Sequence, residues 1–141
     1  MGKYKGSPIE LTPLAQLLGV DKLGKFNVEM RQYVVEITKL NPEALSFYKF
    51  VHGGAIAALF DDTAGMCIYF CHGINSAITE SHTVKFISAM SIKSPLVITC
   101  WVDTDGKKKD DKIIVKGKAE TTNGKVIATM QAVWMLKKET L

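Results

Sequence analysis

The order of hydrophobic and polar positions along the chain predicts one long helix followed by several strands. The apolar stretch from Gly54 to Phe70 is rich in Ala and Met, and Gly73 follows it. This length favours a helix of ~16 residues over a strand. Because the stretch is apolar nearly all round, we expect the helix to be buried on most sides.

Strands are predicted on both sides of this helix, with a short helix before the first of them. Thr12 and Pro13 are typical of a helix start, and Gly19 of its end. Partial alternation predicts one strand over residues 26–40, and the segment 41–50 is expected to be a loop. Further strands are expected at about residues 77–88, 96–103, 112–121 and 126–136.

Two connections between these strands have the composition of hairpin turns. Asn123-Gly124 predicts a type I′ turn between the last two strands, and residues 103–111 form a polar loop between the preceding pair. One buried helix with such strands gives an α+β fold, in which a curved antiparallel sheet wraps around the helix. We expect one domain over residues 1–141, with residues 1–24 as an N-terminal helical segment. The edge strands of such a sheet favour pairing with a second copy.

Composition and charge limit the class of protein. Hydrophobic residues make up 47% of the 141 residues and charged residues 23%, which is ordinary for a globular protein. The net charge of +4 suits a phosphate-bearing partner but is too small to indicate nucleic acid. No membrane partner is expected, because Asp61 and Asp62 interrupt the longest apolar run. The first ten residues lack the apolar core of a signal peptide, so the cytoplasm is expected, with the mitochondrion as the alternative.

The three cysteines are an odd number, which favours a reducing compartment over a disulfide framework. Cys67 and Cys71 lie one helical turn apart and could be combined with His72 and His82 in a metal site. The spacings typical of such sites are missing, so buried apolar cysteines are the better interpretation and no metal is expected.

Asp61 and Asp62 lie in the middle of the predicted apolar helix, where an ionised carboxylate is costly unless it is paired or functional. The positions three, four and seven residues from Asp61 are nearly all small: Gly54, Ala57, Ala58, Ala64, Gly65 and Ile68. A large group could therefore approach Asp61 closely, which makes it the candidate for chemistry. The same positions around Asp62 include larger packing residues, so Asp62 is expected to make a structural hydrogen bond or salt bridge.

His52, Gly53 and Gly54 stand at the start of the helix. The first N–H groups of a helix have no internal partner and lie at the positive end of its dipole. Glycines let a ligand approach these groups, which suits a developing oxyanion, although a simple tight turn would also explain them. His52 has two interpretations, a capping or packing residue and a proton-transfer residue.

The distance between these two features argues for a dimer. Gly53 and Asp61 are eight residues apart, which is ~12 Å along a helix axis. Groups that act on one reacting centre must both lie within about 3 Å of it. A two-fold dimer with antiparallel helices would place Asp61 of one subunit beside Gly53 of the other.

The stretch HGGAIAALFDDTAG, residues 52–65, resembles the signature of the hotdog-fold acyl-CoA thioesterases, of the thioesterase-superfamily-member and phenylacetic-acid-pathway types. Their pattern is His-Gly-Gly with an acid nine residues after the His, which His52 and Asp61 match, and Thr63 also fits. The resemblance implies homodimers or dimers of dimers with the active site at the interface. It also implies an acyl-CoA substrate and a role in fatty acid metabolism.

The resemblance also implies residue roles. Gly53 would polarise the thioester carbonyl through its N–H, and Asp61 of the partner subunit would be the nucleophile or the general base. Thr79 lies where such enzymes carry a Ser or Thr that assists the acid or the water. His52 would support the helix start, and Gly54 would let substrate approach.

The chain departs from the family's pattern at two places. Ser46 occupies the position of an Asn found six residues before the His in some relatives. A Tyr-x-Arg-Pro type strand end is replaced by the four residues from Phe86, which include Ser88. We expect Ser46, Lys85 and Ser88 to bind substrate, with Lys93 and the lysines at 107–109 as further candidates for the CoA phosphates.

Taken together, the residues and the resemblance predict hydrolysis of acyl-CoA thioesters to free acid and CoA, without a metal or an organic cofactor. Two alternatives remain. One is a non-enzymatic acyl-CoA-binding or scaffold protein with the same fold, and the other is a hotdog dehydratase acting on acyl thioesters.

Overall fold

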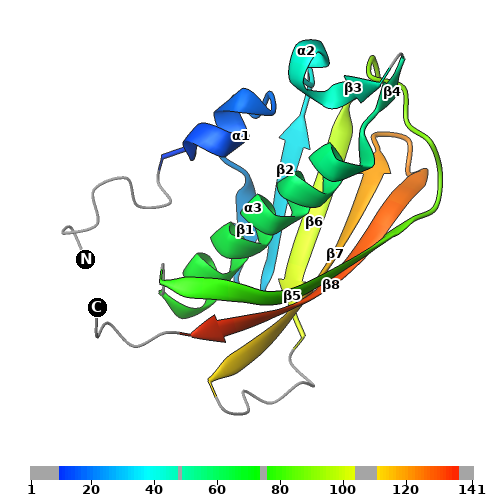
Figure 1. Cartoon of the computed structure of the whole chain (residues 1–141). Coiled ribbons are helices and arrows are strands. Elements are labelled where there is room, and N and C mark those ends of the chain that lie inside the picture. Colours follow the sequence, from blue (N-terminus) through cyan, green and yellow to red (C-terminus); the bar gives the residue numbers. More distant parts are fainter. Residues whose placement is uncertain (1–9, 48, 74–75, 104–110, 137–141) are drawn as a thin grey trace.

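The computed structural model describes residues 10–47, 49–73, 76–103 and 111–136, with the backbone alone for residues 44–47. A six-stranded antiparallel sheet of order β1-β2-β6-β7-β8-β5 curves around one long helix (Figure 1). The elements in chain order are α1 (Pro13–Leu17), β1 (Lys25–Asn27), β2 (Gln32–Ile37), α2 (Pro42–Leu45), β3 (Ser46–Phe47), β4 (Phe50–Val51), α3 (Gly53–His72), β5 (Ala77–Phe86), β6 (Leu96–Val102), β7 (Lys112–Thr121) and β8 (Val126–Leu136). This arrangement confirms the predicted α+β fold.

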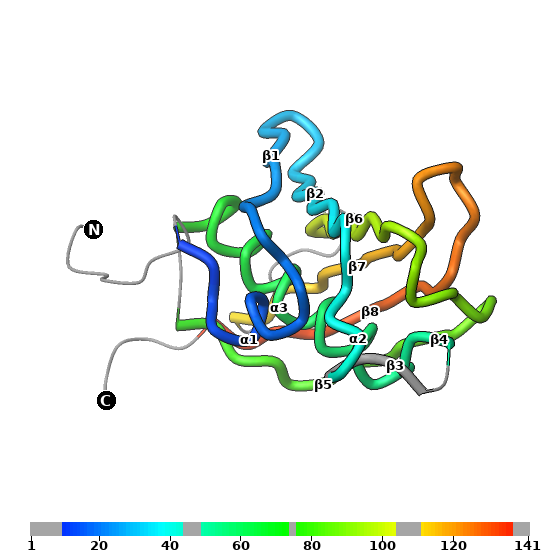
Figure 2. Tube along the Cα trace, turned by 90° about the horizontal axis from the view of Figure 1, so that it is seen from above, coloured from blue at the N-terminus to red at the C-terminus, as the bar shows by residue number. Residues whose placement is uncertain are grey.

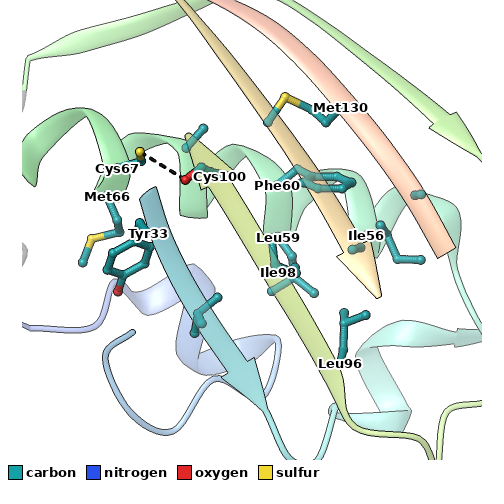
Figure 3. Close-up of a cluster of buried hydrophobic side chains, with 14 of the residues drawn as sticks. Tyr33, Ile56, Leu59, Phe60, Met66, Cys67, Leu96, Ile98, Cys100 and Met130 are labelled. Atoms are coloured by element: carbon teal, nitrogen blue, oxygen red, sulfur yellow. Dashed lines mark hydrogen bonds between the residues drawn. The ribbon is translucent and has the colours of Figure 1, made fainter. Parts of the chain in front are cut away.

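The long helix α3 lies on the concave face of the sheet, as the views in Figures 1 and 2 show. It packs against β2, β5, β6 and β7. Phe60 and Leu59 of the helix are almost fully buried, and the close-up in Figure 3 shows them with Ile98 of β6 and Met130 of β8. The helix ends where Gly73 adopts the left-handed conformation, with φ of 67°, and its N–H bonds to the carbonyl of Tyr69.

By length and composition alone, α3 could cross a membrane, because its mean hydropathy over the most apolar window is 1.3. Half of that window is buried inside this fold, which is the packing of a core helix. The sheet covers one face of α3 and leaves the face containing Gly54, Ala57 and Asp61 partly open. The sequence predicts a helix that is buried on most sides, but within a single chain one face of α3 stays partly open.

The prediction of one strand over residues 26–40 is wrong, because the chain turns back within that range. β1 and β2 form a hairpin, in which the side-chain oxygen of Asn27 accepts a hydrogen bond from the N–H of Met30 at 3.0 Å. Arg31 has a positive φ of 51°. Short polar side chains that bond to nearby backbone groups favour turns. The turn between β1 and β2 therefore depends on side-chain hydrogen bonding and does not appear in the hydrophobic pattern.

The expected loop over residues 41–50 contains structure instead. Asn41 accepts a hydrogen bond from the N–H of Glu43 at 3.1 Å, and the one-turn helix α2 begins at Pro42. β3 and β4 then pair as a small antiparallel hairpin. These elements are too short to show either a two-residue or a 3.6-residue repeat.

The hairpin at Asn123-Gly124 is present, but the turn type is not the predicted one. A type I′ turn needs positive φ at both central residues, and here Gly124 alone of the pair has one, at 89°. The N–H of Gly124 bonds to the carbonyl of Thr121, and the register shifts between Ala119 and Glu120. This is the pattern of a type I turn followed by a bulge glycine.

The remaining element predictions agree with the structure. The side chain of Thr12 accepts a hydrogen bond from the N–H of Ala15 at 3.0 Å, so it caps α1 as expected. The four late strands lie within two residues of their predicted bounds. Most of the polar loop at residues 103–111 lies outside the described residues.

Candidate functional site

Asp61 is held by a threonine from the edge strand. The hydroxyl of Thr79 on β5 donates a hydrogen bond to Oδ1 of Asp61 at 2.7 Å, and both side chains are partly buried. Thr79 pairs with Trp134, which is 7% exposed and lies on the concave face of the sheet. Because paired residues on neighbouring strands point to the same face, Thr79 also faces α3. A charge-assisted bond of this length fixes the orientation of a carboxylate.

Asp62 points to the other side of the helix, toward α1. The hydroxyl of Thr12 donates to Oδ1 of Asp62 at 2.7 Å, so one threonine both caps α1 and contacts α3. Burial raises the pKa of Asp62 above its ordinary value, the bond from Thr12 acts in the opposite direction, and the charge of Asp61 raises it further. Asp62 therefore makes the structural hydrogen bond that its surroundings in the sequence predict.

The face of α3 around Asp61 is lined by small residues and leaves room for another group. A Cβ atom added at Gly54 would meet no atom within 4 Å. Ala57 and Ala58 on the same face are only partly buried. A ligand or a second protein chain can therefore approach the backbone of α3 closely between Gly54 and Asp61.

Gly53 is the first residue of α3, and the ring of Phe86 lies beside it. A Cβ atom added at Gly53 would come within 3.1 Å of that ring. An open pocket of about 320 Å³ adjoins this glycine and is lined by Phe50, Val51, Gly53, Ile56, Phe86, Ile87, Ser88, Ala89 and Met90. The N-terminal end of α3, with its unpaired first N–H groups and positive dipole, thus opens into an apolar pocket.

His52 precedes the helix as its N-cap residue, but its side chain makes no capping hydrogen bond. Its backbone carbonyl accepts from the N–H groups of Ala55 at 3.0 Å and Ile56 at 3.2 Å. His52 is therefore the N-cap residue by position, as one of its two interpretations predicts, although its side chain makes no capping hydrogen bond and the residue is exposed.

A β-bulge in β5 decides which of its residues face the site. Thr79 pairs with Trp134 and Ser81 with Val133, so Glu80 is the extra residue and the alternation of faces shifts by one. Phe86 consequently lies on the same face as Thr79. Lys85 pairs with Thr129 on the opposite face, and it is not among the residues that line the pocket at Gly53.

The structure brings some of the candidate residues together and leaves others apart. Ser88 lines the same pocket as Gly53, whereas Gly54 lies on the open face of the helix. Ser46 belongs to β3, and its side chain lies outside the described part of the structure, as do the lysines at 107–109. Phe50, Phe86 and Met90 line the pocket without having been predicted. The sequence signal for Phe86 was a large apolar residue at a strand end, close to the predicted site.

Two of the cysteines are buried. Cys67 donates to the carbonyl of Cys100 at 3.4 Å, the contact marked in Figure 3. The pKa of Cys67 is raised by its hydrogen bond to Cys71 and by burial, and burial alone raises the pKa of Cys100. Within the described ranges, no group of three His, Cys, Asp or Glu side chains is placed to hold a metal ion.

Comparison with known proteins places this geometry in a fold family. The sequence model of the Thioesterase superfamily matches residues 48–109, which contain α3, Asp61 and Thr79. The chain is a hotdog-fold protein that matches the thioesterase superfamily. No curated protein matches it by sequence.

Three solved structures of similar proteins superpose on most of this chain. The E. coli PaaI protein from the phenylacetic acid degradation operon is 20% identical, with a TM-score of 0.70 and 86% of each chain covered. Zebrafish thioesterase superfamily member 2 is 19% identical, with a TM-score of 0.74, and the match covers 93% of this chain and 91% of that one. A hypothetical thioesterase from Streptococcus pneumoniae, solved with coenzyme A, is 18% identical, with a TM-score of 0.68 and coverage of 80% and 82%. At these identities, the structures establish the fold of the hotdog domain.

Proposed function

We propose that this protein hydrolyses acyl-CoA thioesters to a free acid and CoA, with Gly53 of one subunit and Asp61 of the partner subunit in each active site. The observation that carries the proposal is the placement of Asp61. Its carboxylate is fixed by Thr79 on the face of α3 that the sheet leaves open, in a fold that matches the thioesterase superfamily.

The chemistry needs an oxyanion site and a carboxylate. The N–H of Gly53, at the positive end of α3, donates to the thioester oxygen and stabilises the negative charge that develops on it. Asp61 either attacks the carbonyl carbon or takes a proton from the water that attacks it. The tetrahedral intermediate then breaks its C–S bond, and CoA leaves as a thiolate that takes up a proton. When water is the nucleophile, its oxygen stays on the acyl carbon and the free acid is released directly. When Asp61 is the nucleophile, the acyl group stays on its carboxylate as an anhydride, and water then hydrolyses this anhydride to the free acid and the Asp61 carboxylate.

A single chain cannot assemble this site on a straight helix. Eight residues separate Gly53 from Asp61, which corresponds to ~12 Å along the axis of α3. The edge strand β5 runs antiparallel to α3, since Thr79 near its start contacts Asp61 and Phe86 at its end lies beside Gly53. Antiparallel pairing of two β5 strands would bring the Thr79 end of one subunit to the Phe86 end of the other.

The exposed surface of β5 supports this pairing. Among the described strands, β5 has a neighbour in the sheet, β8, on one side only. Three large apolar residues along this edge are exposed: Ile78 near the start of β5, Phe86 at its end and Ile87 just after it, at 47%, 52% and 54%. An exposed apolar edge strand favours association with a second copy of the chain.

The CoA arm has room beside the Gly53 pocket. A second pocket of about 490 Å³ shares Phe50, Ala89 and Met90 with the first and also contains Lys125 and several hydroxyl and amide side chains. We place the pantetheine arm across these two pockets, with Lys125 near the phosphates. Two similar structures, the hypothetical thioesterase from Streptococcus pneumoniae with coenzyme A and smu.793 from Streptococcus mutans bound to acetyl-CoA, support a CoA ester as substrate.

Four finer parts of the proposal, on substrate, assembly, location and His52, extend the sequence-based expectations. The substrate is a medium- or long-chain fatty acyl-CoA, used in fatty acid metabolism. The protein assembles as a homodimer or a dimer of such dimers, and it acts in the cytoplasm or the mitochondrion. His52 supports the start of α3 next to the oxyanion site.

The test is CoA release from a series of acyl-CoA esters of graded length, followed through the free thiol. We expect turnover by the wild-type protein and a loss of at least about a hundredfold in Asp61→Asn, the scale of a missing base or nucleophile. Asp62→Asn is the matched control, because it makes the same change one residue along the helix and should keep its turnover. Absence of turnover with every ester would contradict the proposal, as would loss in the control alone.

A further inference from the structure

Two nitrogen atoms near Thr79 are buried without a hydrogen-bond partner. They are Nε2 of His82 on β5 and Nε1 of Trp134 on β8, and neither has a partner among the described residues. A buried polar atom without a partner costs free energy, so such atoms are rare and usually have a structural or functional reason. The hydrogen bond from Thr79 to Asp61 accounts for neither of them.

Both side chains share the concave face of the sheet with Thr79. Trp134 is directly opposite Thr79 in the β5–β8 pairing, which places their Cβ atoms roughly 4.5–5.5 Å apart. His82 is opposite Ala132, a core residue that is 1% exposed, so its imidazole faces α3 as well. The bulge at Glu80 makes His82 the next residue after Thr79 on that face, about 7 Å further along the strand.

The hydrogen-bonding capacity of these three groups is complementary. The hydroxyl of Thr79 uses its hydrogen on Asp61 and keeps oxygen lone pairs that can accept. The indole N–H of Trp134 can only donate, and Nε2 of a neutral histidine accepts when its other nitrogen carries the proton. One buried water that accepted from Trp134 and donated to His82 and Thr79 would satisfy all three groups.

We propose that His82 and Trp134 are positioning residues that act through Thr79. They hold the Thr79 hydroxyl so that its hydrogen points to Asp61, and they thereby fix the carboxylate on the open face of α3. Donation to the Thr79 oxygen also polarises its hydroxyl and strengthens the bond that it makes to Asp61. This inference rests on the proposed function, because it concerns the orientation of the same carboxylate.

The test is a double-mutant cycle on CoA release. His82→Leu and Trp134→Phe each remove one polar group and leave an apolar side chain, which is smaller than the native one at position 134. We expect each to lower kcat about tenfold, the effect of one neutral hydrogen bond, with KM changed by less than about twofold. His82→Gln retains a polar amide on that face and should recover most of the loss.

The cycle distinguishes positioning from general damage to the fold. In a Thr79→Val background, the hydroxyl through which both residues act is gone, so His82→Leu and Trp134→Phe should cause almost no further loss. Additive losses in that background, or unchanged kcat in both single variants, would overturn the inference. If wild type has no thioester turnover at all, the proposed function fails together with it, whereas an active wild type with an additive cycle overturns the positioning role alone.

Unfolding midpoints of the single variants complete the design. If His82 and Trp134 had a purely structural role, the substitutions would lower stability, and activity would be lost only because less of the protein is folded. We expect activity per folded molecule to fall in His82→Leu and Trp134→Phe. Equal activity per folded molecule in both variants and wild type would overturn the inference.

Discussion

Replacing Thr79 by Val tests how much the orientation of Asp61 contributes to turnover. Valine keeps the branched shape of the side chain on β5 but removes the hydroxyl that donates to Oδ1 of Asp61 at 2.7 Å. A hydrogen bond to a charged group contributes about 1.5–3 kcal/mol. If this contribution is made in the transition state, kcat should fall roughly 10- to 150-fold.

The assay is CoA release under saturating acyl-CoA, with the folded fraction measured in parallel. Thr79→Ser restores a hydroxyl at the same position and should recover most of the lost rate. Thr129→Val is the matched control, because it makes the same change on the neighbouring strand β8 but on the opposite face, across from Lys85. Unchanged kcat in a folded Thr79→Val protein would show that the bond to Asp61 does not contribute to turnover, and an equal loss in Thr129→Val would show that the effect is not specific to that bond.

Further predictions concern the contact between α1 and α3. Because burial raises the pKa of Asp62 in the folded chain, the unfolded chain loses this proton first, and the free energy of unfolding falls as pH rises from about 4 through the raised pKa. In urea unfolding, the free energy of unfolding of Asp62→Asn minus that of wild type should therefore increase between about pH 4 and pH 7. A difference that stays constant over this range would contradict the raised pKa of Asp62. Thr12→Val removes both the cap of α1 and the bond to Asp62, so it should lower the free energy of unfolding by about 1–3 kcal/mol, while Thr12→Ser should lower it far less.

The longest helix and the four late strands were predictable from the sequence, because each depends on a hydrophobic pattern that extends over many residues. The α3 helix has a long apolar run and a terminal glycine, and the four late strands have clear turn residues between them. The turn of the β1–β2 hairpin is marked by a local contact from the N–H of Met30 to the side-chain oxygen of Asn27, which leaves no periodic signal. β3 and β4 are two residues long, which is too short for such a signal.

The candidate site was predictable where it depends on spacing within the helix. The small residues around Asp61 distinguish it from Asp62 as the candidate for chemistry. The structure shows that the two acids lie on different faces of α3 and have different threonine partners. The faces of β5 were not predictable, because simple alternation from Thr79 puts Lys85 on the site face. The bulge at Glu80 reverses this and brings His82 and Phe86 to that face instead.

In the proposed assembly each thioesterase site is built from two subunits, and mixing two inactive variants tests whether the sites are shared. Asp61→Asn removes the carboxylate, and Gly53→Val obstructs the helix N-terminus, where an added Cβ already approaches the Phe86 ring at 3.1 Å. Both variants must still form dimers, which sedimentation or light scattering verifies before mixing.

In a mixed dimer with shared sites, one site carries both defects and the other carries neither. Co-refolding the two variants should therefore give mixed dimers with up to about half of the wild-type CoA-release activity. Separate sites within each chain would keep one defect each. Mixed dimers that form and remain inactive would contradict the shared-site account.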